Sequence, residues 1–214
     1  MNRAEAISRA QQHFQSGEFL KILDRRVGYR TESQQANSGA ALRAYLTDEL
    51  QPALAELGFT SRLIESPSGK GPFLLADYRE DASLPTVLSY GHGDVVDGMM
   101  GEWRDNLDPW RTTVRGERVY GRGTADNKGQ HSINISALAM VRAARGGRLG
   151  FNAKFIVETG EEIGSPDLRK VCEAHREELK ADLFLASDGP RLSAERPTIF
   201  LGCRGGLRIH LDVN

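Results

Sequence analysis

The chain has few cysteines, no long apolar run and almost no net charge, and each of these absences excludes a class of protein. Its 214 residues include two cysteines, Cys172 and Cys203, without CxxC spacing, which argues against both a disulfide framework and a thiolate zinc site. No apolar run approaches the length of a membrane span, and the first residues lack the apolar core of a signal peptide. A net charge of −1 gives no electrostatic reason to expect nucleic acid or an anionic membrane as a partner. We therefore expect a cytoplasmic globular protein with two reduced thiols.

The order of helix and strand patterns predicts the class of fold. Apolar residues at helical spacing predict helices over residues 3–14, 19–27, 38–57, 128–144 and 166–179. Short β-rich runs bounded by glycine, proline or aspartate predict strands over residues 61–65, 73–78, 86–90, 152–157 and 183–186. Because strands alternate with helices, we expect an α/β fold with the sheet buried between helices. The buried side of the helix over 128–144 is expected to carry Ile133, Leu138 and Val141.

A histidine and an aspartate follow the strand predicted over residues 86–90. The glycines at 91 and 93 permit a sharp turn and a close approach of the backbone to a bound group. His92 and Asp94 would then stand at the carboxyl end of a strand, where open α/β sheets place their ligand sites. We interpret His92 as a metal ligand and Asp94 as the carboxylate behind it that accepts the other ring N–H. A surface or capping pair is the alternative.

Further carboxylates stand at comparable places. Asp126 begins a predicted helix, where it could either cap the helix or bridge two metal ions roughly 3.5–4 Å apart. Glu161 and Glu162 follow another strand, and neighbouring side chains of extended backbone point in opposite directions. One of them could therefore bind a metal while the other takes a proton from bound water, although a solvated pair is the alternative. Asp188 closes the strand over 183–186, with a turn-forming role as its alternative.

One imidazole and several carboxylates at strand ends form a set of ligands that suits zinc, or manganese or cobalt in related sites. We therefore expect two divalent metal ions, zinc first. A carboxylate-rich calcium module is a different interpretation, and it gives no role to His92.

Four motifs, in this order and at these spacings, resemble the co-catalytic zinc exopeptidase/aminoacylase family. They are Gly91-His92-Gly93-Asp94, the run 121–129 with sequence GRGTADNKG, the run 161–165 with sequence EEIGS, and Ser187-Asp188. That family includes acetylornithine deacetylase, succinyl-diaminopimelate desuccinylase, carboxypeptidase G and carnosinase-like dipeptidases. The resemblance runs from about residue 20 to the end of the chain. It implies a zinc-exopeptidase-like layered fold with a central mixed, largely parallel sheet flanked by helices, interrupted by a lid domain that often dimerises.

The resemblance also implies a role for each site residue. The metal ligands would be His92, Asp126, Glu162 and Asp188. Asp126 would bridge the two ions, Glu161 would be the general base, and Asp94 would support His92 from behind. A cis peptide bond between Asp126 and Asn127 is implied as well.

The chain departs from the family at one ligand and at the lid. The last metal ligand of the family is a histidine downstream of the lid, and none of the five histidines stands there: His13, His92, His131, His175 and His210. We expect His13, His131 and His175 on helix surfaces, with support of the site as an alternative for His131, and His210 in a lid strand. Residues 1–205 would be the N-terminal part of the catalytic domain, and residues 206–214 the first strand of a truncated lid, joined at Gly205-Gly206. A homodimer through the lid is expected for a full-length protein.

These residues predict metal-dependent hydrolysis of an amide or peptide bond in a small, carboxylate-bearing substrate. The run over 196–205 resembles the carnosinase-like branch, which favours a dipeptide as substrate. An N-acyl-amino-acid deacylase is the alternative within the same class, and an inactive remnant that lacks the last histidine ligand is the alternative from another class. Trp103 and Trp110 stand in or beside a long polar stretch, where they would either line the substrate side or pack the loop.

Overall fold

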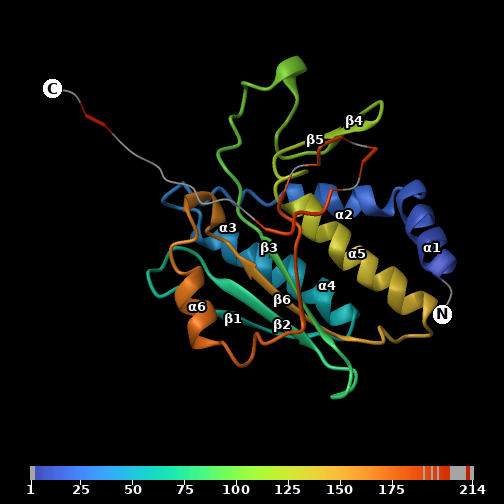
Figure 1. Ribbon diagram of the computed structural model, residues 1–214. Helices are drawn as coiled ribbons and strands as arrows, with labels where there is room; N and C mark the ends of the chain where they lie inside the picture. Colours follow the sequence, from blue (N-terminus) through green and yellow to red (C-terminus); the bar gives the residue numbers. More distant parts are fainter. Residues whose placement is uncertain (1–2, 190, 194, 197, 203–210, 213–214) are drawn as a thin grey trace.

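The computed structural model describes residues 3–189, 191–193, 195–196, 198–202 and 211–212. The helices are α1 (Arg3–Gln15), α2 (Glu18–Val27), α3 (Gly39–Ala44), the π-helical segment η1 (Tyr45–Leu50), α4 (Gln51–Glu56), α5 (Lys128–Ala144) and α6 (Leu168–Ala174), with 3₁₀ turns η2 (Arg104–Asn106) and η3 (Glu161–Ile163). The strands are β1 (Thr60–Ile64), β2 (Phe73–Tyr78), β3 (Thr86–His92), β4 (Thr113–Arg115), β5 (Arg118–Tyr120), β6 (Asn152–Glu158) and β7 (Leu183–Ala186). Figure 1 shows the central sheet with helices packed against it and the β4–β5 hairpin above α2. The predicted α/β layers are confirmed.

The central sheet has the strand order β1-β2-β6-β3-β7. Strand β2 is antiparallel to both of its neighbours, whereas β6, β3 and β7 pair in parallel. Because β1 and β6 both oppose β2, four of the five strands run in one direction, as expected for a mixed, largely parallel sheet. The carboxyl ends of β3, β6 and β7 consequently meet at one edge of the sheet, where ligand sites form in such folds.

The middle strands are hydrophobic on both faces because helices cover both of them. One face carries Leu74, Ala76, Ala153, Phe155 and Val157, which pack with residues of η1, α4 and α5. The opposite face carries Phe73, Leu75 and Ile156, which pack against Val171 of α6. Side chains therefore alternate between two cores along β2 and β6, as strand geometry requires.

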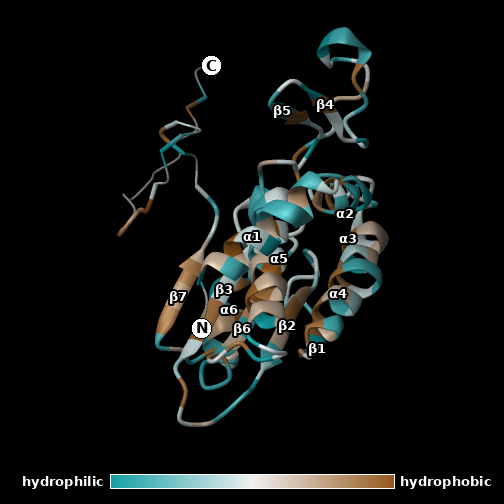
Figure 2. Ribbon diagram, turned by 90° about the vertical axis from the view of Figure 1, so that its right-hand side faces the viewer, coloured by the Kyte–Doolittle hydropathy of each residue, from teal (hydrophilic) through white to brown (hydrophobic). Residues whose placement is uncertain are grey.

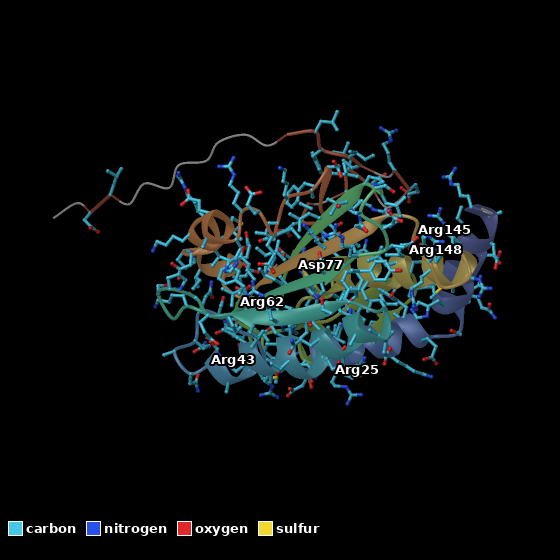
Figure 3. The ribbon with its side chains drawn as sticks, turned by 90° about the horizontal axis from the view of Figure 1, so that it is seen from below. Arg25, Arg43, Arg62, Asp77, Arg145 and Arg148 are labelled. Carbon is cyan, nitrogen blue, oxygen red and sulfur yellow. The ribbon has the colours of Figure 1, made fainter. Side chains whose placement is uncertain are left out.

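The face under α6 is less covered than the other face. Leu88, Tyr90 and Phe184 line an open apolar groove there, and Leu183, Phe184 and Leu185 of the edge strand β7 are exposed. Figure 2 shows β7 as a hydrophobic strand at one side of the sheet. The opposite edge is more polar: Arg62 of β1 pairs with Glu178, and Arg43 pairs with Glu65 (Figure 3). Charged side chains on an edge strand oppose pairing with another chain.

The prediction of a single helix over residues 38–57 is partly wrong. The segment is helical throughout, but η1 separates α3 from α4, and Pro52 stands at the start of α4. A proline has no N–H and cannot continue the ladder of i to i−4 hydrogen bonds. The wider π-helical turn of η1 lies directly before this proline, where the ladder is interrupted.

Two other helix predictions are also wrong in part. The helix predicted over 166–179 is shorter: α6 runs from Leu168 to Ala174. Asp167, directly before it, accepts hydrogen bonds with its carboxylate from Ser66 and Ser68. In α5, Ile133 is exposed and Ile135 is buried. Two positions along a helix turn the side chain by about 200°, so burial of Ile135 turns Ile133 away from the core. Leu138 and Val141 pack against the core as predicted.

Several predictions concern residues outside the described ones: Cys203, His210, the joint at Gly205-Gly206 and most of the lid strand. Cys172 is a free thiol. Among the described residues, no helix combines the length and the apolar character needed to cross a membrane.

Candidate metal centre

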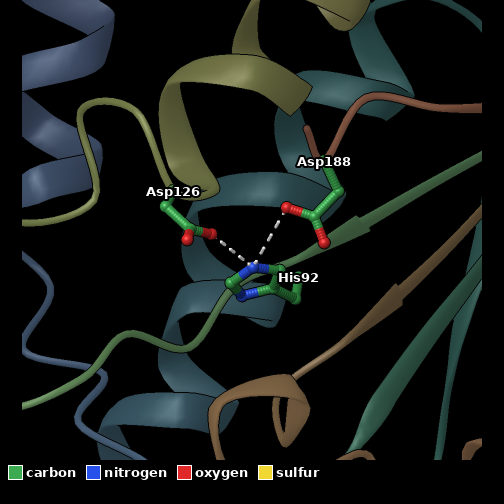
Figure 4. A group of neighbouring side chains, drawn as sticks. All are labelled: His92, Asp126 and Asp188. Atoms are coloured by element: carbon green, nitrogen blue, oxygen red, sulfur yellow. Dashed lines mark hydrogen bonds and ion pairs between the residues drawn. The ribbon is translucent and has the colours of Figure 1, made fainter. Parts of the chain in front are cut away.

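His92 lies at the carboxyl end of β3 with its side chain fully buried. Its Nδ1 lies 3.0 Å from the backbone carbonyl oxygen of Asp94, and because a carbonyl can only accept, Nδ1 carries a proton. The other ring nitrogen, Nε2, faces two carboxylates. It lies 2.8 Å from Oδ1 of Asp126 and 3.7 Å from Oδ1 of Asp188 (Figure 4). This orientation leaves Nε2 as the nitrogen that can bind a metal ion.

Three elements that are far apart in the sequence supply this cluster. His92 comes from β3, Asp126 from the turn before α5, and Asp188 from the segment after β7. One ligand atom of each residue lies within 4.8 Å of the others, which is a spacing that one ion can span. The peptide bond between Asp126 and Asn127 is cis, as the resemblance implies. The Asp126 carboxylate is largely exposed and that of Asp188 partly so, so both can be reached from outside.

Glu161 and Glu162 follow β6 in η3 and lie beside the cluster. Oε2 of Glu161 is 3.9 Å from Nε2 of His92, and the Glu161 side chain is about one third exposed (38%). Burial raises the pKa of Glu162, and the charge of Asp126 raises it further, while His92 lowers it. The structure therefore brings both glutamates to the strand edge that carries His92.

The Asp94 carboxylate contacts two segments rather than the one predicted: His92, and the turn that begins at Glu161 and Glu162. Its Oδ1 lies 3.4 Å from Nδ1 of His92, but the shorter contact of that nitrogen is with the backbone oxygen of Asp94. The carboxylate also accepts hydrogen bonds from the backbone N–H groups of Glu161, at 3.2 Å, and of Glu162, at 3.1 Å. Asp94 thus connects the end of β3 to the turn that carries both glutamates. The sequence did not reveal this second contact, because the residues are 67 and 68 positions apart.

The electrostatics of the cluster favour a cation at Nε2 of His92. Burial acts to lower the pKa of His92, but the nearby carboxylates of Asp188 and Asp94 outweigh it and raise the pKa to about 11. In the absence of metal these carboxylates therefore hold a proton on the ring. A divalent ion bound at the same place would satisfy the same charges, so the residues present fit a metal ion.

His131 was predicted on a helix surface, and that prediction is wrong. Its side chain is completely buried behind His92, between Tyr45 and Asn127. The signal that points to such packing is the pair of glycines around His92. A Cβ on Gly91 would lie 2.9 Å from Cβ of His131, so the strand needs glycine to approach the helix this closely.

The two tryptophans lie outside the cluster. Trp110 is buried, with its ring packed against Gly98 and under the guanidinium of Arg30. Trp103 donates from Nε1 to the carbonyl oxygen of Gly98 and lines a hollow of about 570 Å³ beside the β4–β5 hairpin. None of the predicted site residues lines that hollow. The interpretation of these rings as loop packing is therefore favoured over a substrate-side role.

A buried histidine and several carboxylates, gathered where parallel strands end in a layered α/β fold, define a divalent-metal centre of the kind found in metallohydrolases. Comparison with known proteins gives the family. The profile of peptidase family M20/M25/M40 matches residues 88–204, which is more than half of the chain. The chain belongs to this family of hydrolases.

Individual relatives agree with this assignment. The probable di- and tripeptidase DUG2 of Saccharomyces cerevisiae is 30% identical over 209 residues, which cover 92% of this chain and 23% of that protein. Succinyl-diaminopimelate desuccinylase 2 of Ruegeria sp. (strain TM1040) is 30% identical, with 86% of this chain and 45% of that protein covered. The crystal structure of human carnosine dipeptidase 1 superposes with a TM-score of 0.78 at 28% identity, over 89% of this chain and 42% of that chain. The chain thus spans less than half the length of each of these relatives.

Proposed function

We propose that this chain carries the metal-binding part of a dipeptidase-like hydrolase that cleaves an amide bond in a small, carboxylate-bearing substrate. The observation that supports this most strongly is the cluster of His92, Asp126 and Asp188, with Glu161 3.9 Å from the same ring nitrogen. The family and its dipeptidase relatives support the reaction class.

In this proposal two zinc ions bind at the strand edge. His92 and Asp188 would hold the first ion and Glu162 the second, and Asp126 would be shared between them. When bound, the ions polarise the scissile carbonyl group and make a coordinated water more acidic. Asp94 orients the ring of His92 and the turn of the two glutamates.

Glu161 acts as the general base in this proposal. Burial raises the pKa of its carboxyl group, and among the nearby charges Asp188 and Asp94 raise it while His92 lowers it. A carboxyl group whose pKa is closer to neutral transfers protons more effectively at neutral pH. Glu161 would take the proton of the attacking water and pass it to the leaving amine.

A deacylase that acts on N-acyl amino acids is the second candidate. It is favoured by the desuccinylase relative, which covers 86% of this chain. Dipeptides and N-acyl amino acids share an amide bond beside a carboxylate, so the metal centre described above serves either substrate.

The domain division at residue 206, a lid and a homodimer through it also remain proposals.

The test is hydrolysis of an L-dipeptide and of an N-acetyl-L-amino acid with added zinc. We expect amine release that depends on metal, that disappears in Glu161→Ala, and that persists in Glu173→Ala. Glu173 is a suitable control because it is an exposed glutamate of α6 that pairs with Arg169. Hydrolysis that survives Glu161→Ala unchanged would contradict the proposed base.

Titration with zinc separates an active centre from an inactive remnant. Two zinc ions per chain support the complete centre. One ion or none, together with no hydrolysis of either substrate, would support the remnant, in which the last ligand is missing.

A further inference from the structure

Three polar side chains lie directly behind the metal centre without any exposure to solvent. They are Tyr45 of η1, Asn127 at the start of α5 and His131 in its first turn. Buried polar groups are costly unless they are hydrogen-bonded, and these three bond to one another in a chain. The Tyr45 hydroxyl lies 2.5 Å from Nε2 of His131, and Nδ1 of His131 lies 3.1 Å from Oδ1 of Asn127.

The direction of each hydrogen bond follows from the side chain of Asn127. Its amide nitrogen lies 2.7 Å from both the backbone oxygen of Ser187 and Oε1 of Gln130, and 3.0 Å from Oδ1 of Asp188, so its two N–H groups are shared among these three acceptors. The nitrogen therefore faces the end of β7, and the oxygen faces His131. Because that oxygen can only accept, Nδ1 of His131 must carry the proton. Nε2 of His131 is then an acceptor, and the Tyr45 hydroxyl donates to it.

A neutral His131 agrees with this assignment. Burial lowers its pKa well below the ordinary value, and the cationic groups of Arg26, His92 and Lys128 lower it further. A protonated ring would carry an N–H group at both nitrogens, and only the one at Nδ1 would meet an oxygen that can do nothing but accept, Oδ1 of Asn127. The Tyr45 hydroxyl would then have to accept rather than donate.

The Asn127 side chain connects the two strand ends that carry proposed metal ligands. Its oxygen accepts from the backbone N–H of His92, at 3.2 Å, while its nitrogen donates to the carboxylate of Asp188. If the amide turned over, its nitrogen would meet the N–H groups of His92 and His131, and its oxygen would face the carboxylate of Asp188. The orientation of one amide thus decides whether β3 and β7 present their ligands together.

We propose that Tyr45 and His131 are positioning residues for the metal centre: they fix the orientation of the Asn127 amide and, through it, the placement of His92 and Asp188. The inference rests on the proposed function only in taking His92 and Asp188 as ligands. Tyr45 and His131 touch neither the metal ions nor the substrate in this account.

The packing of β3 against Tyr45 and His131 also supports a positioning role for these two residues. A Cβ on Gly93 would lie 2.6 Å from the ring of Tyr45, and a Cβ on Gly91 would lie 2.9 Å from Cβ of His131. The two glycines that flank His92 therefore lie against the two proposed positioning residues, one against each. The strand β3 therefore lies directly against these unexposed side chains.

The first test is made without metal, by NMR of the imidazole nitrogens and of the Asn127 side-chain amide. We expect His131 to be protonated at Nδ1 and the Asn127 amide protons to exchange slowly. In Tyr45→Phe, which removes only the hydroxyl, the His131 resonances should shift toward a mixture of tautomers and the Asn127 amide protons should exchange faster. A matched control is Tyr78→Phe, because Tyr78 packs against the same core and its hydroxyl bonds to Glu80 instead. Protonation of His131 at Nε2 in the unchanged chain would overturn the proposal.

The second test measures metal binding, with zinc affinity from chelator competition and with the absorption spectrum of the cobalt-substituted site. Loss of an outer partner of a ligand typically weakens metal binding about 10- to 100-fold. Because Tyr45 and His131 act through Asn127, we expect the lower part of that range, about 10-fold, in Tyr45→Phe and in His131→Leu, with a changed cobalt spectrum, and unchanged binding in Tyr78→Phe. A thermal melt shows which variants are folded, and the folded ones decide the outcome. If the unchanged chain binds zinc and both folded variants bind it equally well, the positioning role is wrong while the proposed function stands. If the unchanged chain binds no metal, the proposed function fails, and the NMR result still decides the assignment of His131 and Asn127.

Discussion

At the residue scale, a metal ion and a proton compete for Nε2 of His92. The nearby carboxylates of Asp188 and Asp94 hold the pKa of His92 at about 11 against the opposing effect of burial, so the ring is cationic at pH 7.5 without metal. Zinc bound at Nε2 must displace that proton. We expect zinc binding to release protons and the apparent affinity to rise by about tenfold per pH unit for each proton displaced.

Calorimetry in two buffers with different ionisation enthalpies measures this release. The observed heat should depend on the buffer in the unchanged chain, and the dependence should fall by about one proton in His92→Ala. Identical buffer dependence of the two proteins would mean that His92 does not give up a proton to the metal.

A second residue-scale feature is the buried ion pair of Arg26 and Glu49. Both side chains are almost fully buried, the Nε–Oε1 distance is 2.9 Å, and Arg26 also donates to Ser132 of α5. Glu49→Gln would leave the Arg26 charge buried without its partner, which typically costs about 3–5 kcal/mol. Arg25→Gln is the control, because Arg25 binds the same carboxylate but is half exposed, and such contacts are worth about 1 kcal/mol or less. Urea unfolding compares the two, and equal losses would contradict this account of the pair.

At the scale of elements, the Glu80 side chain binds the backbone of the segment that precedes β6. It follows β2, and its Oε2 accepts from the backbone N–H groups of Leu149, at 2.6 Å, and Gly150, at 3.0 Å. The Gly150 N–H contributes most to holding the pKa of Glu80 at about 2, with further lowering from Arg148 and opposition from burial. A carboxyl group whose pKa is lowered on folding stabilises the protein above its unfolded pKa and loses that contribution as the pH falls.

We therefore expect the melting temperature to fall between pH 4.5 and pH 2, in part because Glu80 becomes protonated. Glu80→Gln should have a lower melting temperature than the unchanged chain at pH 6, and the difference should shrink toward pH 2. A difference that stays constant over this range would contradict the assigned role. Melts followed by circular dichroism measure it.

Elements whose ends are marked by local sequence were predicted well, strands and helices alike. Strands β2 and β7 and helix α5 begin and end where predicted, and β3 extends two residues further, to His92, whereas the short strands β4 and β5 were not predicted. The limits of α6 depend on contacts with distant residues. Helix α6 ends earlier than predicted, and the Asp167 carboxylate accepts hydrogen bonds from Ser66 and Ser68. These residues are about 100 positions apart, so no local pattern shows the contact.

Some residues of the candidate site could be recognised from the sequence and others could not. His92, Asp126 and Asp188 carry motifs that can be recognised in the sequence, and the structure places them together. His131 carries no such motif, and its contact with Tyr45 joins residues 86 positions apart. Nothing in the spacing of the two indicates that contact. The glycines at 91 and 93 indicate a close approach to β3, and the fold shows which side chains make it.

At the scale of the whole molecule, the centre joins segments that only the folded chain brings together. A ligand that binds the folded state alone stabilises it by about 2.7 kcal/mol at a free concentration 100 times its dissociation constant. We expect zinc to raise the melting temperature of this chain by several degrees and a chelator to reverse the effect. Asp126→Ala should remove most of the rise, and Asp97→Ala, an exposed carboxylate that bonds to Gln35, should retain it. A rise of equal size in Asp126→Ala would place the metal elsewhere.

X-ray absorption at the zinc edge tests the metal centre most directly. With zinc bound to the chain, the spectrum should show a first shell of nitrogen and oxygen atoms, with the outer-shell scattering that an imidazole ring produces, and that outer-shell scattering should disappear in His92→Ala. A first shell that contains sulfur, or a spectrum that His92→Ala leaves unchanged, would contradict the central claim that His92 and the carboxylates at the strand ends bind the metal.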